Sequence, residues 1–156
     1  MSLITDAFSR RIVGYCLYPT LEAIGCIDAL EMALATRKKD CKLIHHSDRG
    51  IQYCSADYVA MLISGKIDIS MTQSGSPYEN PLAERMNGIL KNEFYPKRVY
   101  QNHKEAVKVL TSNIQVYNSK RPHLSLGYLT PDEAHTMTGN ITKSWKKYPK
   151  KKKQVL

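Results

Sequence analysis

The chain has 156 residues, of which 42% are hydrophobic, so its size and composition fit one globular domain with a buried core. No apolar run is long enough to span a membrane, and we expect no signal peptide because no basic segment precedes an apolar one at the N-terminus. The net charge of +9 favours a polyanionic partner, DNA or RNA first.

The first third of the chain predicts a hairpin, a helix and a third strand. A short apolar stretch at 2–5 is followed by 11–18, which is rich in β-branched and aromatic residues, and a turn joins them. Thr20 is a favourable N-cap for a helix over 21–37, where apolar residues recur at helical spacing. Residues 42–46 then read as a short strand.

The middle of the chain predicts a second helix and a fourth strand. Ser55 is suited to cap a helix over 56–64, and Gly65 is suited to end it. Residues 67–71 (IDISM) predict the strand that follows.

The remaining elements are helical. A helix is expected from Asn80 to about residue 94, because Asn80 can cap it and proline follows at its first position. Another should run from residue 102 or 103 to about 118, and 130–133 (TPDE) resembles a capped helical turn. The order of strands and helices predicts a mixed α/β layer fold.

Positive charge is concentrated at the C-terminus, where seven lysines within 143–153 account for most of the net charge. We therefore divide the chain into a core, residues 2–138, and a basic tail, residues 139–156. The tail is either a DNA-contacting or linker segment or a solvated end.

The four cysteines show no zinc-binding pattern. No two are separated by two residues, and His45 and His46 are adjacent, so they would point to opposite sides of a strand. We predict reduced, mostly buried thiols in a cytoplasmic protein.

Two carboxylates lie where sheets and helices commonly expose their chemistry. Asp48 follows a predicted strand, and Glu84 lies in the first turn of a predicted helix, where the helix dipole stabilises its ionised form. Such a pair could hold divalent metal ions for in-line phosphodiester displacement. Both also have ordinary alternatives, since Asp is common in turns and Glu is common in first helical turns; from the residues alone the question stays open.

The helix that contains Glu84 has two different faces. Glu84, Asn87 and Lys91 share one face, because they are spaced three and four residues apart. The apolar side chains lie opposite, and Glu93 falls among them, which the amphipathic pattern leaves unexplained. The polar face suits a metal ion and a phosphate backbone; the alternative is a solvated face.

Two segments of the chain resemble known motifs. Residues 45–53, HHSDRGIQY, resemble the second acidic motif of bacterial insertion-sequence transposases with a retroviral-type integrase core, and residues 76–93, SPYENPLAERMNGILKNE, resemble the third. The 35 residues between Asp48 and Glu84 match that family's spacing. Weaker similarities at 6–14 and 117–131 extend the resemblance over residues 2 to about 138.

The resemblance implies a ribonuclease H-like α/β fold, a five-stranded mixed sheet flanked by helices. It implies that Asp48 and Glu84 are two of three carboxylate ligands for Mg²⁺ or Mn²⁺ in a two-metal site. The implied reaction is cleavage at the ends of a mobile element, followed by attack of the freed 3′-hydroxyl on target DNA. The partners would be these DNAs and further copies of the protein, with no membrane.

One departure from the family concerns its first catalytic aspartate. That residue lies on the strand before the one that opens this chain, and the resemblance gives Asp6, a turn residue, no metal role. We therefore expect a sheet without its first strand and a chain that is inactive by itself. We also expect unpaired strand edges, compensated by rearrangement or by pairing with a second copy.

The resemblance also suggests residues that bind DNA. Lys91 resembles a lysine expected to contact element-end DNA, and Asn87 is expected to touch the same strand. Arg121 and His123 are weaker candidates, for phosphate contact or for structural pairing. His45 and His46 are predicted to be strand residues rather than ligands.

Two tyrosines, Tyr117 and Tyr128, are predicted to be core or loop anchors rather than base-stacking platforms.

Two other functions remain as alternatives. The first is a ribonuclease H-like nuclease that hydrolyses DNA without joining it. The second is a non-catalytic DNA-binding remnant of a mobile element.

Overall fold

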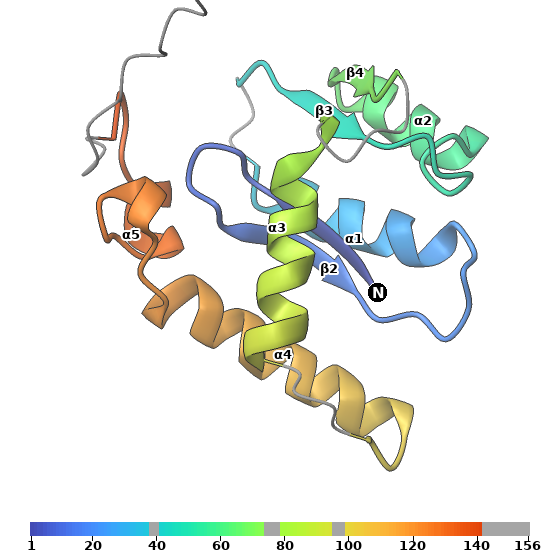
Figure 1. The fold of residues 1–156 in the computed structure, drawn as a ribbon. Helices are drawn as coiled ribbons and strands as arrows, with labels where there is room; N and C mark the ends of the chain where they lie inside the picture. Colours follow the sequence, from blue (N-terminus) through green and yellow to red (C-terminus); the bar gives the residue numbers. More distant parts are fainter. Residues whose placement is uncertain (38–40, 74–78, 95–98, 142–156) are drawn as a thin grey trace, which may run out of the picture.

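The computed structural model describes residues 1–37, 41–73, 79–94 and 99–141. Along the chain its elements are β1 (Ser2–Thr5), β2 (Ile12–Cys16), α1 (Ile24–Ala35), β3 (Ile44–Ser47), α2 (Ala56–Ser64), β4 (Asp68–Met71), α3 (Pro81–Ile89), the π-helix η2 (Leu90–Phe94), α4 (His103–Lys120), the 3₁₀ turn η3 (Leu124–Leu126) and α5 (Pro131–His135) (Figure 1). The predicted basic tail lies, from residue 142 onward, outside the described residues.

The strands form two separate pairs. β1 and β2 make an antiparallel hairpin in which Ser2 lies opposite Cys16. β3 and β4 are parallel, with Ile44 opposite Asp68. Within the part of the chain that the structure describes, no hydrogen-bonded ladder joins the pairs, so each strand has one strand partner. The expected unpaired edges are therefore present.

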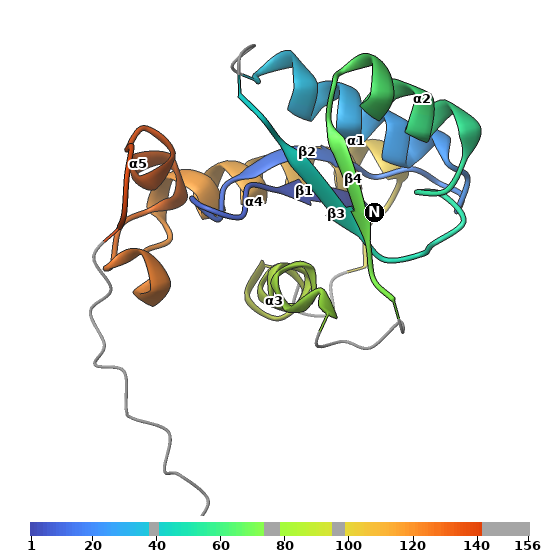
Figure 2. The same cartoon turned by 90° about the horizontal axis from the view of Figure 1, so that it is seen from above.

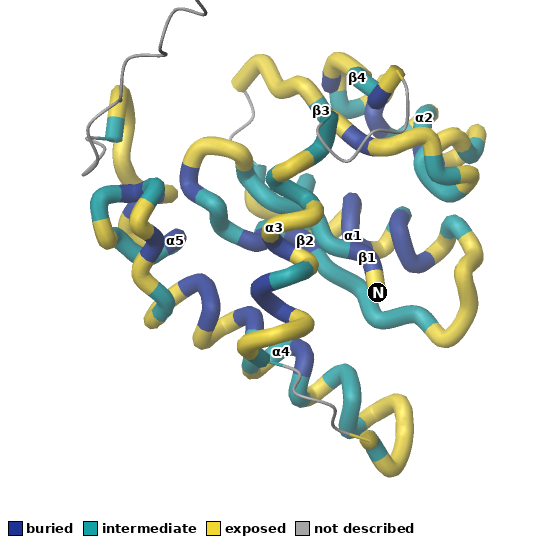
Figure 3. The backbone as a smooth tube through the Cα atoms, viewed as in Figure 1, coloured by how far each residue is buried: buried dark blue, intermediate teal, exposed yellow. Residues whose placement is uncertain are grey.

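The helices cover both sides of the strands. Figure 2 shows α1 and α2 on one side and α3 on the other. One core cluster lies under α1 and α2 and includes Cys26, Leu30, Tyr58, Leu62 and Ile67. A second cluster joins β2, α3, η2 and α4 and contains Ile12, Met86, Ile89, Leu90, Leu110, Ile114 and Tyr117. Figure 3 shows the buried residues as dark blue stretches of the backbone, which alternate with exposed ones along α3 and α4.

Gly14 lets β2 approach α1 very closely. A Cβ atom at this position would lie 2.0 Å from the backbone oxygen of Ala29. Because a backbone oxygen in a helix cannot move aside as a side chain can, only glycine fits here without shifting α1.

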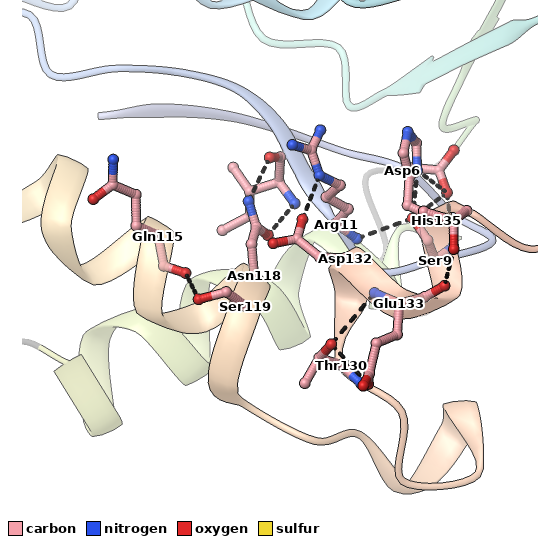
Figure 4. Close-up of polar contacts among 12 residues, drawn as sticks. Asp6, Ser9, Arg11, Gln115, Asn118, Ser119, Thr130, Asp132, Glu133 and His135 are labelled. Atoms are coloured by element: carbon pink, nitrogen blue, oxygen red, sulfur yellow. Dashed lines mark hydrogen bonds and ion pairs between the residues drawn. The ribbon is translucent and has the colours of Figure 1, made fainter.

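Hydrogen bonds fasten the N-terminal hairpin to the C-terminal helices (Figure 4). The Asn118 amide accepts a bond from the backbone N–H of Ile12 and donates one to its carbonyl, both at 3.0 Å. The Arg11 Nε donates to Asp132 at 2.7 Å.

Local side-chain hydrogen bonds stabilise the turn between β1 and β2 and also the start of α5. Asp6 accepts two bonds from Ser9, and Ser9 also contacts the His135 ring at 3.0 Å. Asp6 is therefore a turn residue, as expected. Thr130 and Glu133 form a reciprocal capping box at the start of α5, as the sequence predicts.

Several predicted boundaries need correction. α1 begins at Ile24 rather than residue 21, and its N-cap is Ala23. Thr20 instead bonds locally to Glu22, because a threonine hydroxyl can satisfy a nearby backbone N–H in a turn as well as at a helix start. β2 covers only Ile12–Cys16 of the predicted 11–18. α4 runs two residues further than predicted, to Lys120.

The cysteines are free, as expected, but the prediction that most are buried is wrong. Only Cys26 is buried; Cys16 is intermediate, and Cys41 and Cys54 are exposed. Cys41 and Cys54 lie in connecting segments, which run over the surface. Among the described residues, no helix is both long and apolar enough to cross a membrane.

Candidate metal and DNA site

Asp48 lies just after β3, at the end of the parallel strand pair. Its Oδ1 accepts a 2.9 Å hydrogen bond from the backbone N–H of Gly50, which shapes the turn. The neighbouring Arg49 donates from Nε to the carbonyl of Thr72 at 2.7 Å, so the turn is fastened to the end of β4. Asp48 is exposed, and Oδ2 has no hydrogen-bond partner among the described residues.

Glu84 lies in the first turn of α3, as predicted. Pro81 occupies the start of the helix, where its missing N–H costs nothing. Asn80 is the N-cap residue, although its side chain makes no capping bond. Glu84 is exposed, and its carboxylate has no hydrogen-bond or ion-pair partner in the described parts of the chain.

His46 ties the strand that precedes Asp48 to the start of α3. Its Nε2 lies 3.1 Å from the carbonyl oxygen of Glu79, and its Nδ1 lies 2.9 Å from the Ser70 hydroxyl of β4. A carbonyl only accepts, so Nε2 is the nitrogen that carries a proton. Because Glu79 immediately precedes the helix cap, this bond brings the Asp48 strand end beside the helix that bears Glu84 (Figure 1).

His45 points toward the opposite side, into the fold. Its ring packs on Tyr58 with centroids 5.5 Å apart, and its Nε2 meets the Tyr58 hydroxyl at 3.1 Å. Burial lowers the pKa of His45 below its ordinary value. Both histidines therefore act as strand residues with structural partners, as predicted.

The helix formed by α3 and η2 has a polar exposed face and an apolar buried face, as predicted. Asn87 and Lys91 are exposed like Glu84, whereas Met86, Ile89 and Leu90 are buried. The polar side chains are therefore available to a ligand from solvent. Their contacts with DNA remain predictions.

The structure explains the position of Glu93. α3 continues as the π-helix η2 from Leu90, and the wider π turn shifts later residues around the helix axis. Glu93 is exposed and accepts two hydrogen bonds from Arg121, at 2.6 and 2.7 Å. These bonds lower the pKa of Glu93 and raise that of Arg121. The residue that the amphipathic pattern left unexplained is one half of an ion pair.

His123 is buried beside this ion pair. Arg121 has no acceptor atoms, so its contact with His123 Nε2 at 3.2 Å requires an unprotonated Nε2. Burial, together with the nearby charges of Arg121 and Arg10, lowers the pKa of His123 to about 4. At neutral pH the ring is uncharged, which favours structural pairing over phosphate contact for this residue.

The two tyrosines differ. Tyr117 is fully buried in the core, as predicted, and its hydroxyl donates to the carbonyl of Arg10 at 2.9 Å. Tyr128 is 65% exposed, so the prediction that its side chain anchors a loop is wrong. Its backbone N–H, which bonds the carbonyl of His123 at 2.9 Å, holds the loop instead.

Two exposed carboxylates lie on elements that the His46–Glu79 bond ties together, Asp48 after β3 and Glu84 in α3. Carboxylate oxygens are the ligands that Mg²⁺ and Mn²⁺ prefer. Among the described residues, however, no group of three or more His, Cys, Asp or Glu side chains lies close enough to hold a metal ion.

A groove of about 600 Å³ runs along α3 and η2 beside Glu84. Arg85, Asn92 and Glu93 line it with Glu84. Arg85 could not be singled out from the sequence, since nothing in its spacing distinguishes it from other surface arginines. The His46–Glu79 bond could not be predicted either, because it depends on how β3 and α3 meet.

Comparisons with known proteins agree on one family. Profiles described as "Integrase core domain" match residues 1–77 and 65–131. The chain is 32% identical over 134 residues to a Shigella sonnei protein named transposase for insertion sequence element IS629, covering 86% of this chain and 45% of that protein. It is 34% identical over 134 residues to the Escherichia coli transposase InsF for insertion sequence IS3fB, covering 85% and 46%. The chain thus spans about half the length of these relatives.

Solved structures confirm the fold. The HTLV-2 integrase catalytic core domain, solved in complex with magnesium, superposes with a TM-score of 0.64 at 19% identity over 85% of this chain and 81% of that one. A chain of the simian T-cell lymphotropic virus intasome gives 0.71 at 20% identity, covering 92% and 51%. The ribonuclease H-like fold class predicted from the motifs is therefore confirmed.

Proposed function

Because the chain belongs to the Integrase core domain family, we propose that it forms most of the catalytic core of a DNA transposase. This enzyme would cleave phosphodiester bonds at the ends of a mobile element and join the freed 3′-hydroxyl to target DNA. DNA of both kinds would be its substrate. Such an enzyme would act where bacterial DNA lies, in the cytoplasm.

The observation that carries this proposal is the bond between His46 and Glu79. It holds the end of β3, with Asp48 directly after it, against the start of the helix that bears Glu84. Two exposed carboxylates from elements tied together in this way suit a shared metal site. Under this proposal Asp48 is a metal ligand as well as a turn residue.

We propose that Asp48 and Glu84 hold Mg²⁺ or Mn²⁺ together with a third carboxylate from outside this chain. Bound metal ions activate the attacking oxygen and stabilise the leaving oxygen in phosphodiester displacement. The Gly50 N–H donates to Oδ1 of Asp48 and so orients its carboxylate, and Glu84 lies in the N-terminal turn of α3. By this proposal the chain alone is inactive.

Lys91 and Asn87 extend the site along the exposed face of α3 and η2. We propose that they contact the backbone of the element-end strand, which would place its scissile phosphate near Glu84. Lys91 lies in η2, about two helical turns from Glu84. An ammonium group at that point can neutralise a neighbouring phosphate.

We further propose that the working enzyme is an oligomer. The HTLV-2 integrase core has been solved in dimeric and trimeric forms. In this chain β1 and β3 each have one strand partner among the described residues, so each has an edge that can pair with a further strand.

A strand-transfer assay tests the proposed function. It would use a longer protein that adds the family's preceding strand to this chain, labelled element-end DNA, and Mg²⁺ or Mn²⁺. Glu84→Gln is the matched control, because it keeps the size of the side chain and one acceptor oxygen and removes the charge. Joined products that require metal, and that disappear in E84Q, are the expected result.

Two other outcomes would select the alternatives. Metal-dependent cleavage without joining would identify a ribonuclease H-like nuclease. Binding of element ends by a folded protein, without any metal-dependent product, would identify a non-catalytic remnant.

A further inference from the structure

A second groove lies on the other flank of α3. It has a volume of about 850 Å³ and is bounded by α3 and the segment 121–128. Its charged side chains are Arg10, Arg85 and Arg121, and none of the described residues that line it is acidic. The exposed ring of Tyr128 also lines it. The groove is therefore positively charged and carries an aromatic surface.

Arg10 and Arg85 supply the charge that is not already paired. Arg121 is bonded twice to Glu93, so most of its charge is neutralised. Among the described residues the Arg10 guanidinium donates only to the carbonyl of Ala7, so no carboxylate compensates its charge. Arg85 is exposed and has no carboxylate partner within 4.0 Å among the described residues. Two guanidinium groups are thus available to an anion.

The backbone presents Arg10 and Tyr128 in an unusual conformation. Their φ angles are 64° and 70°, and only one other described non-glycine residue, Lys66, has a positive φ. A left-handed residue with a side chain costs about 1 kcal/mol, so it persists only where its surroundings hold it. Here the Tyr117 hydroxyl holds the Arg10 carbonyl, and a backbone bond to His123 holds Tyr128.

The groove is adjacent to the candidate catalytic helix face. It shares Pro81, Arg85 and Ile89 with the 600 Å³ groove that contains Glu84. A strand that lies in one groove can therefore continue into the other across Arg85.

We propose that this groove binds a DNA strand next to the scissile phosphate, with Arg10 and Arg85 on its phosphates and Tyr128 stacked on a base. This rests on the proposed function for the identity of the polymer. An exposed aromatic ring beside unpaired guanidinium groups is the arrangement that binds single nucleic-acid strands without reading their sequence. Arg121 and Glu93 act as the fixed wall between the two grooves.

Metal-free binding measurements test the groove separately from catalysis. The full chain would be titrated, in EDTA and over a range of salt, against a short fluorescein-labelled oligonucleotide of mixed sequence, as a single strand and as a duplex. The R10Q/R85Q double variant is compared with K104Q/K108Q, which removes the same charge from exposed positions near the start of α4, far from Arg121.

We expect R10Q/R85Q to make the salt dependence shallower. The negative slope of log association constant against log salt should decrease in magnitude by roughly 1.4 for a single strand and 1.8 for a duplex. K104Q/K108Q should change it much less. Tyr128→Ala should weaken single-strand binding by about tenfold, and Tyr128→Phe should restore it, because stacking needs the ring and not the hydroxyl. Photocrosslinking with 5-iododeoxyuridine in the strand should label the peptide that contains Tyr128.

Three results would overturn the groove assignment. These are equal salt slopes for the two double variants, crosslinks confined to other peptides, and a change in oligomeric state of R10Q/R85Q without loss of DNA affinity. The last would identify a protein interface instead. If the groove variants behave as expected while strand transfer never occurs, the proposed catalytic function fails and the DNA groove stands.

Discussion

The C-terminal anchor, residues 117–135, and the carboxylate edge, formed by Asp48 and Glu84, use polar residues in opposite ways. In the anchor, polar side chains bond to the rest of the fold: Asn118 to β2, Arg121 to Glu93, and Asp132 to Arg11. At the carboxylate edge, Glu84 has no partner among the described residues, and Asp48 uses one oxygen.

Both regions belong to segments that resemble the same family, yet their physical roles differ. Removing a bonded polar group from the anchor leaves its partner unsatisfied, whereas removing a solvated one does not. The free energy of unfolding should therefore separate the two regions.

Asn118→Ala should have the largest effect. It leaves the backbone N–H and carbonyl of the buried Ile12 without partners, at a cost of roughly 3 kcal/mol. Urea or thermal unfolding measures the change. Gln115→Ala, an exposed position on the same helix, is the control and should stay within about 0.5 kcal/mol. Equal stability of the two variants would show that Asn118 does not fasten β2 to α4.

His123 should make stability depend on pH. Its pKa falls from 6.5 to about 4 in the folded protein, so between these values the unfolded chain binds a proton that the folded chain does not. Stability should therefore be full above pH 6.5 and decrease as pH falls toward 4, by on the order of 2 kcal/mol in total. Unfolding curves across this range should lose most of that slope in His123→Gln. An unchanged slope would mean that other groups cause it.

The Glu93–Arg121 pair should contribute less, because the Glu93 side chain is 46% exposed. We expect a coupling of about 1 kcal/mol or less from the cycle of E93Q, R121Q and the double variant, weaker in high salt. Since Arg121 lowers the pKa of Glu93, this contribution is present above the ordinary glutamate value and is lost as pH falls through the lowered one. A coupling that does not change with salt would argue against an ionic contribution.

The elements themselves could be predicted from the sequence because their signals are local. Helix caps such as Thr130, the proline at the start of α3 and the β-branched run in β2 depend on neighbours within a few residues. The boundary of α1 could not be predicted, because the Thr20 hydroxyl can bond a nearby backbone N–H in a turn as well as at the start of a helix.

The site was only partly predictable for a different reason. Asp48, Glu84, Asn87 and Lys91 were found from motif spacing and helical periodicity. The exposed Tyr128, the groove of Arg10 and Arg85, and the bond between His46 and Glu79 join residues far apart in the chain. No pattern within one segment carries that information.

Asp48→Asn should have the smallest effect on stability. The asparagine oxygen can still accept the bond from Gly50, so the turn is retained and the free energy of unfolding should change by less than about 0.5 kcal/mol. The same substitution removes the negative charge that a divalent metal needs, so strand transfer by the longer protein should be lost. Together these two measurements decide between the two roles of Asp48. If D48N unfolds as readily as Asn118→Ala, then Asp48 is a turn residue like Asp6. Its carboxylate would then stabilise the fold, as the polar groups of the anchor do.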